Sequence, residues 1–247
     1  MNAMEERVSP EMNEELQKDF KAKEVWTALK QMHPTKALSL DGMSPIFYQT
    51  YWDIVGPSVT NCVLLAFNLG VMSKELKNTY LPNSQDKKPQ TITEYRPISL
   101  CNMIYKIMSK VLANRLKKVL HGVINEAQSA FVLGRLIMDN VIVAFEIMHS
   151  IDKKRKGLMA VKLDMSKAYN RVEWTYLESM MKKMGFGERW IFLIMMCVTS
   201  VTYSILINGE PKGAITSSRG PNLPILVLVV WGRLVGNDKK ERKGGAG

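Results

Sequence analysis

The period of the hydrophobic residues changes near residue 157, and no other feature of the sequence limits the fold so strongly. In the first part of the chain, apolar residues recur at helical spacing, as in "EVWTALKQM" (24–32), which predicts a helix over 21–32. After the change, "GLMAVKLD" (157–164) is apolar and too short for a helix, so it predicts a buried strand. The chain therefore combines helices with strands.

A β-hairpin is predicted further along the chain. The segment "VTYSILING" (201–209) alternates and ends on Asn208-Gly209, a dipeptide typical of tight hairpin turns. Its second strand is expected through 212–218. Because helical segments precede and separate these strands, the pattern indicates an α+β fold with a helix-rich N-terminal part and a small antiparallel sheet.

Capping residues, prolines and glycines delimit the helices. Ser9, followed by Pro10 and Glu11, is typical of a helix start. Residues 78–97 contain three prolines and are expected to form turns. The other predicted helices cover 45–54, the segment from Pro57 to Gly70, 102–120, a segment that carries Met138, Val141, Ile142, Phe145 and Met148 toward the core, 173–184 and 188–199.

The helix over 102–120 has a basic face. Its apolar residues form one stripe, and Lys106, Lys110, Asn114 and Lys117 lie on the opposite side. Such a face can follow a phosphate backbone. A solvated surface with no partner is the simpler interpretation, and the sequence leaves both open.

The charge balance favours the first interpretation. The chain has 34 Lys and Arg against 23 Asp and Glu, a net charge of +11. An excess of this size favours polyanionic partners such as nucleic acid or an anionic membrane surface. A basic surface without a partner remains the alternative.

The cysteine pattern and the hydropathy of the chain indicate in which cellular compartment the protein is expected. The three cysteines are far apart and show neither zinc spacing nor a disulfide framework, which fits a reducing environment. The polar N-terminus is not typical of a secretory signal, and the longest late apolar run, 225–231, is far shorter than a membrane span. We expect an intracellular protein without a membrane partner, in the nucleus or the cytoplasm.

Asp164 follows the predicted strand directly. A carboxylate at a strand end is held rigidly, and Mg²⁺ prefers one or two such oxygen ligands together with substrate phosphates. A turn or helix-capping aspartate would have the same position without binding metal. The residue alone does not decide between these roles.

Four segments together carry a resemblance to a known family. They are "EYRPISLCNMIYKIMSKVLANRL" (94–116), "QSAFVLGRLIMDNV" (128–141), "LDMSKAYNRVEW" (163–174) and "YSILINGEP" (203–211). In this order and spacing they resemble the reverse transcriptases of LINE-type non-LTR retrotransposons, with plant elements as the nearest. Weaker similarity at 24–52 extends the resemblance to roughly residues 20–220.

The resemblance implies a right-hand polymerase with Mg²⁺ as cofactor and RNA template, RNA–DNA hybrid and dNTP as partners. It places Asp164 at the family's first catalytic, metal-binding aspartate. Tyr169 would pack under the sugar of the incoming nucleotide, and Arg96 would lie near its triphosphate. Gln128, Phe131 and Arg135 would lie near the template, and Arg219 and Gly220 would open the motif that supports template and nucleotide.

Some positions depart from the family pattern. Asn170 replaces a second aspartate that is not a metal ligand, and Leu38-Ser39-Leu40 replaces a Pro-Gly-Pro segment. After Arg219-Gly220 the family's paired aspartates and thumb do not follow; the later acids are Asp238 and Glu241 alone. Since one carboxylate cannot hold two metal ions, we expect a truncated and inactive polymerase.

The expected organisation has four parts: a helical N-terminal extension (1–70), a fingers-like region (71–157), a partial palm (158–220) and an aberrant, disordered tail (221–247). A non-catalytic nucleic-acid-binding remnant is the main alternative. A gene product that does not fold stably is a third possibility.

Overall fold

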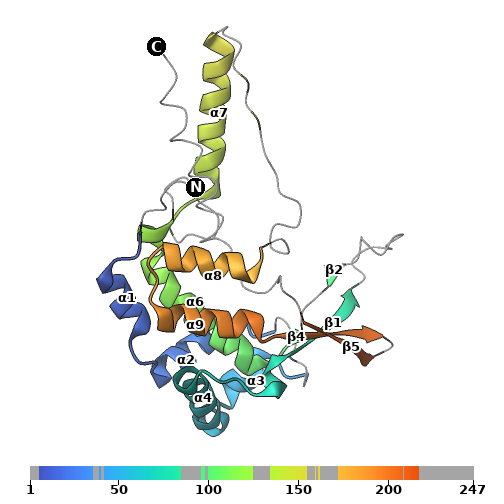
Figure 1. The fold of residues 1–247 in the computed structure, drawn as a ribbon. Coiled ribbons are helices and arrows are strands. Elements are labelled where there is room, and N and C mark those ends of the chain that lie inside the picture. Colours follow the sequence, from blue (N-terminus) through green and yellow to red (C-terminus); the bar gives the residue numbers. More distant parts are fainter. Residues whose placement is uncertain are drawn as a thin grey trace.

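The computed structural model describes residues 6–35, 39, 42–84, 96–97, 100–124, 134–154, 159, 161, 172–207 and 209–216. In these ranges a body of helices carries a small sheet on one side, and one long helix stands apart from both (Figure 1). The helices are α1 (Pro10–Gln17), α2 (Ala22–Lys30), α3 (Pro45–Thr50), α4 (Trp52–Leu69), α5 (Lys74–Lys77), α6 (Met103–Val123), α7 (Ile137–Lys154), α8 (Trp174–Lys183) and α9 (Glu188–Thr199).

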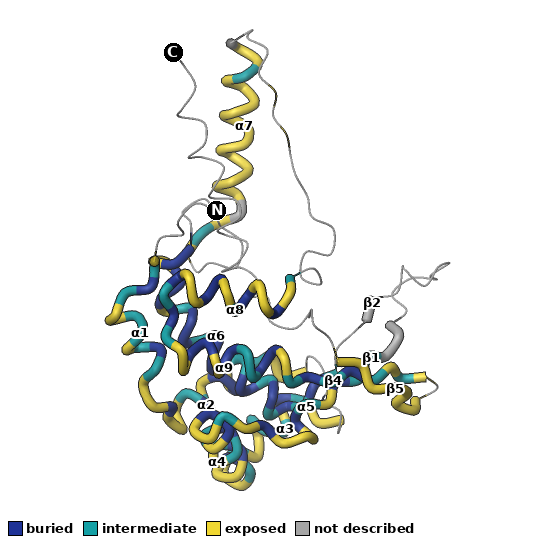
Figure 2. Tube along the Cα trace, in the orientation of Figure 1, coloured by how far each residue is buried: buried dark blue, intermediate teal, exposed yellow. Residues whose placement is uncertain are grey.

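Helix α6 is the centre of the hydrophobic core. Figure 2 shows it buried along most of its length, and it packs against α1, α2 and α4. The Asn102 side chain caps its start by accepting a 2.9 Å hydrogen bond from the Ile104 N–H. At its first turn the Tyr105 hydroxyl donates to the Cys197 carbonyl of α9 at 2.9 Å. The predicted helix over 102–120 is thus confirmed, and the molecule packs around it.

The first two helices begin where the sequence predicts. The Ser9 hydroxyl accepts a hydrogen bond from the Met12 N–H, and Pro10 occupies the first helical position. At the start of α2 the Glu24 carboxylate accepts from the Lys21 N–H at 2.9 Å. Asn13 fastens α1 to the α8–α9 turn, because its amide donates to the Gly185 carbonyl at 2.6 Å and accepts from the Gly187 N–H at 2.7 Å.

The predicted boundary between the next two helices is wrong. A helix over 45–54 and a second one after Pro57 were expected, but α3 ends at Thr50 and α4 begins at Trp52. Pro57 therefore lies within α4, where its ring removes the one hydrogen bond that its nitrogen would have donated. The end of α4 agrees with the prediction, since Gly70 adopts the left-handed conformation with φ 65°.

The sheet is mixed rather than antiparallel. Strand β1 (Asn78–Ser84) pairs in parallel with β4 (Thr202–Ile207), starting at Asn78 opposite Thr202. On the other side of β1, β2 (Arg96–Pro97) and β3 (Leu100–Cys101) run antiparallel to it. The turns expected over 78–97 are therefore replaced by strand at β1 and β2. Local composition cannot predict this pairing, because β1 and β4 are far apart in the sequence.

The C-terminal hairpin and the preceding helices are confirmed. Strands β4 and β5 (Glu210–Thr216) are antiparallel, with Ile207 opposite Glu210 and Gly209 at φ 84° in the turn. Helices α8 and α9 agree with the predicted ranges and are separated at Gly185, whose φ of 85° suits glycine.

Helix α7 exists as predicted, but its apolar residues do not face a core. Figures 1 and 2 show it standing away from the helical body with an exposed surface. The Phe145 residue, for example, is 72% exposed. Helical spacing predicts an apolar face, but it does not determine whether another element covers that face.

The strand predicted over 157–164 lies outside the described residues, except for Met159 and Val161. These two residues are exposed and belong to no strand. The tail over 221–247 also lies outside the described residues. Among the helices that the structure describes, none is long and apolar enough to cross a membrane.

Candidate nucleic-acid interface

The predicted lysine face of α6 is present. Lys106, Lys110, Asn114 and Lys117 are half-buried, while the residues between them are mostly buried. Burial lowers the pKa of Lys110, and the nearby charge of Lys117 lowers it further. The two ammonium groups therefore repel each other in a partly desolvated position, which a negatively charged ligand would relieve.

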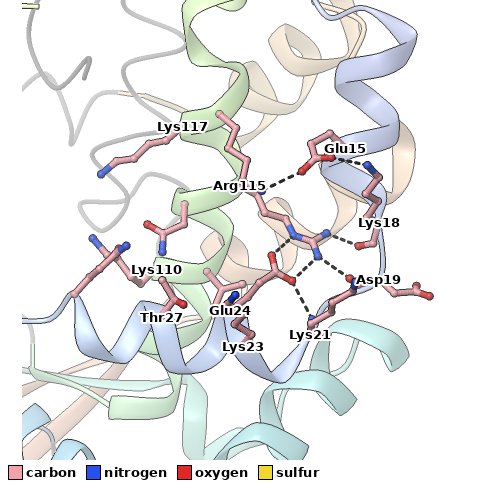
Figure 3. Close-up of a pocket in the computed structure, with 14 residues that line it drawn as sticks. Glu15, Lys18, Asp19, Lys21, Lys23, Glu24, Thr27, Lys110, Arg115 and Lys117 are labelled. Carbon is pink, nitrogen blue, oxygen red and sulfur yellow. Dashed lines mark hydrogen bonds and ion pairs between the residues drawn. The ribbon is translucent and has the colours of Figure 1, made fainter. Parts of the chain in front are cut away.

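Lys110 and Lys117 line a groove between α6 and the α1–α2 segment. Its volume is about 780 Å³ (Figure 3). Its titratable side chains are seven Lys or Arg and three Asp or Glu, so cations predominate. The cations are Lys18, Lys21, Lys23, Lys110, Arg115, Lys117 and Lys118. Lys106, the third predicted lysine, lies one turn before Lys110, outside this lining.

Arg115 fixes the two walls of the groove together. Arg115 is only 4% exposed, and all five N–H groups of its guanidinium have acceptors. Two of them bind the Glu24 carboxylate in a bidentate pair, with Nε–Oε1 at 2.7 Å and Nη2–Oε2 at 2.8 Å. The others bind the carbonyl oxygens of Leu16, Lys18 and Asp19. One α6 side chain thus holds the chain that links α1 to α2.

The electrostatics of Glu24 reflect this contact. Burial acts to raise the pKa of Glu24, but the hydrogen bonds and charge of Arg115 and the bond from the Lys21 N–H outweigh it. The pKa of this carboxyl therefore lies below its ordinary value, and the ion pair is present at neutral pH. The guanidinium also lies over the Phe20 ring, with Cζ 3.6 Å from the ring centroid.

The other acids of the groove are paired as well. Glu15 accepts from Lys18 at 2.7 Å and from Lys118 at 3.0 Å, and these bonds lower its pKa to about 2. Asp19 lies 3.7 Å from Arg189. Within the described part of the chain, no ion pair forms at Lys21, Lys23, Lys110 or Lys117. The groove therefore holds four cations without acidic partners there.

The structure describes only two of the residues that the resemblance singled out, Arg96 and Arg135. Asp164, Tyr169, Gln128, Phe131, Arg219 and Gly220 lie outside the described residues. Arg96 has a described backbone in β2, where it pairs with Ser84 of β1. Arg135 is half-buried, just before α7 begins. No cluster of three His, Cys, Asp or Glu side chains that could hold a metal occurs in the ranges that the structure describes.

Sequence reasoning missed Arg115, Glu24, Lys21 and Lys23. A signal for Arg115 was present, because it falls between Leu112 and Leu116 on the apolar stripe of α6, where a cation requires a buried partner. Nothing local identified Glu24 as that partner, since the two residues are 91 positions apart.

Comparisons with known proteins give this surface its context. The family described as reverse transcriptase (RNA-dependent DNA polymerase) matches residues 85–221, a range that includes all of α6. The transposon TX1 uncharacterized 149 kDa protein of Xenopus laevis is 31% identical over 216 residues, which cover 86% of this chain and 16% of that protein.

A second relative is the retrovirus-related Pol polyprotein from type-1 retrotransposable element R2 of Nasonia vitripennis. It is 27% identical over 138 residues, or 54% of this chain and 12% of the relative. The chain thus spans a small part of either relative, and neither is a plant protein, so the expected resemblance to plant elements stays a prediction. On the family match over more than half of its length, the chain belongs to the reverse transcriptases, with relatives among non-LTR retrotransposon proteins.

Proposed function

We propose that this chain forms the fingers and the first part of the palm of an RNA-directed DNA polymerase, which extends a primer with dNTPs on an RNA template. The family match over 85–221 carries the proposal, because that range contains α6, Arg96 and Asp164. In this organisation residues 1–70 are an N-terminal extension, 71–157 resemble fingers and 158–220 are a partial palm. The pairing of β1 with β4 would join fingers and palm in one sheet.

Each motif residue then has a role. The Asp164 carboxylate is an oxygen donor that suits Mg²⁺, and the metal would activate the primer hydroxyl and hold the triphosphate. Arg96, Tyr169, Arg219 and Gly220 would contact the incoming nucleotide. Gln128, Phe131 and Arg135 would lie along the template, and Lys106, Lys110 and Lys117 would bind phosphates.

The 247-residue chain alone should not polymerise. Two metal ions need several carboxylates, and Asp164 is the one aspartate of this sequence at a family metal position. Asp238 and Glu241 are the later acids, in a basic segment without a strand pattern. The missing metal ligands would have to come from outside these residues. Without them, the site loses several kcal/mol of transition-state stabilisation. About 1.4 kcal/mol corresponds to a tenfold change in rate.

Primer extension tests this proposal. The chain is assayed on a primed RNA template with dNTPs and Mg²⁺ or Mn²⁺, alone and joined to the segment that follows the matched region in the Xenopus relative. We expect extension by the joined protein only, loss of it in Asp164→Ala, and retention in the control Asp152→Ala, which changes an exposed α7 carboxylate. Extension by the 247 residues alone that depends on Asp164 would contradict the carboxylate argument.

Nucleic-acid binding without catalysis is the second candidate, and the basic groove favours it. If the joined protein binds primed RNA but never extends it, with Asp164 intact, binding alone is the function that remains. A filter-binding measurement beside the extension assay separates the two.

A further inference from the structure

The groove draws its cations from two distant parts of the chain. Lys110 and Lys117 lie on α6, inside the range that matches the polymerase family. Lys21 and Lys23 lie at the start of α2, before that range begins. Figure 3 shows these α2 residues across the groove from α6. The family match over 85–221 therefore covers one wall only.

The three acidic side chains of the groove already pair with basic side chains. Glu24 binds Arg115, Glu15 binds two lysines, and Asp19 faces Arg189. Four lysines remain without an acidic partner among the described residues, two on each wall. A polyanion between the walls would gain electrostatic binding energy from all four, because they line the same groove.

Arg115 preorganises the groove. It binds one carbonyl oxygen at the end of α1, two in the link between α1 and α2, and the Glu24 side chain in the first turn of α2. The backbone that carries Lys21 and Lys23 is thereby fixed relative to α6 before any ligand arrives. A ligand would have to order lysine side chains only, and not the chain that carries them.

We propose that the groove between α2 and α6 binds the phosphate backbone of a single RNA strand, with Lys21 and Lys23 on one wall and Lys110 and Lys117 on the other. This rests on the proposed nucleic-acid binding and extends it to the N-terminal helices. The four lysines lie on the two walls of one groove of about 780 Å³, so a single phosphate backbone between the walls would contact all of them. Lysines at phosphates carry no base information, so binding is independent of sequence.

The expected salt dependence of RNA binding follows from the number of phosphate contacts. Each phosphate contact on a single strand contributes about −0.7 to the slope of log K against log salt, so four contacts contribute about −2.8. Between about 50 and 200 mM salt they account for a fall of about 50-fold in affinity. Removal of the two α2 lysines should make the slope shallower by about 1.4, whatever other contacts exist.

Fluorescence anisotropy with labelled oligouridine tests the proposal on the full chain. The variants are Lys21→Gln/Lys23→Gln for the α2 wall and Lys110→Gln/Lys117→Gln for the α6 wall. The matched control is Lys74→Gln/Lys183→Gln, which removes the same charge from exposed positions outside the groove lining. Urea unfolding verifies that every variant is folded.

We expect both groove variants to weaken binding at low salt and to reduce the slope, while the control retains both. If the α6 variant alone has this effect, the inference is overturned and the proposed function stands. If neither variant differs from the control, the inference fails together with the phosphate-binding role proposed for Lys110 and Lys117, and primer extension still decides the polymerase function. Tighter binding of duplex RNA than of oligouridine would also overturn the assignment to a single strand.

Discussion

Replacement of Arg115 by lysine should destabilise the protein by about 3 kcal/mol. Lysine keeps the positive charge but has three N–H donors instead of five, so at least two of the present acceptors lose their donor. The bidentate geometry with Glu24 is also lost.

The magnitude follows from the burial of the two partners. Hydrogen bonds to charged groups contribute about 1.5–3 kcal/mol each, so two lost bonds amount to about 3–6 kcal/mol. The Glu24 side chain is 29% exposed, so solvent screens part of the pair and the lower end of the range applies. Since small proteins are stable by about 5–15 kcal/mol, the loss is a large fraction of the total.

Urea unfolding followed by circular dichroism measures this change, with the slope of the transition used to verify two-state behaviour. The matched control is Arg189→Lys, because Arg189 is exposed and lies 3.7 Å from Asp19. It should change stability by less than about 0.5 kcal/mol. A loss below about 1 kcal/mol for Arg115→Lys would refute the argument that this side chain holds α6 to the α1–α2 link.

Three further predictions concern individual contacts. Asn13→Ala should cost about 2 kcal/mol in urea unfolding, because it leaves two backbone groups of the α8–α9 turn unpaired, whereas the exposed Asn61→Ala should be nearly neutral; equal losses would contradict this. The pKa of Glu15 is lowered to about 2, so its stabilisation, measured as the difference from Glu15→Gln, is present above its ordinary pKa of 4.5 and is lost as pH falls toward about 2; a difference that is independent of pH would argue against the pairing. Gly56→Ala should lower the melting temperature, since the new Cβ would lie 2.6 Å from the Trp52 ring; an increase would show that the ring moves at little cost.

The sequence by itself determined the local elements. Helical spacing located α2, α6, α8 and α9, the Ser9 cap located the start of α1, and Asn208-Gly209 located the hairpin. These predictions succeeded because caps, turns and amphipathic faces depend on residues a few positions apart. The same local reading identified the lysine face of α6, and the motif order predicted the reverse transcriptase family.

Tertiary structure alone decided which distant segments meet. The parallel pairing of β1 with β4 replaced the expected turns, and α7 left its apolar face exposed where a core contact was expected. The Arg115–Glu24 pair joins residues 91 positions apart and brings the α2 lysines opposite those of α6. Such contacts depend on which surfaces become neighbours after the chain packs, and no short window of sequence records this. The positive net charge was therefore predictable from composition, but the groove that brings the lysines together forms only in the folded chain.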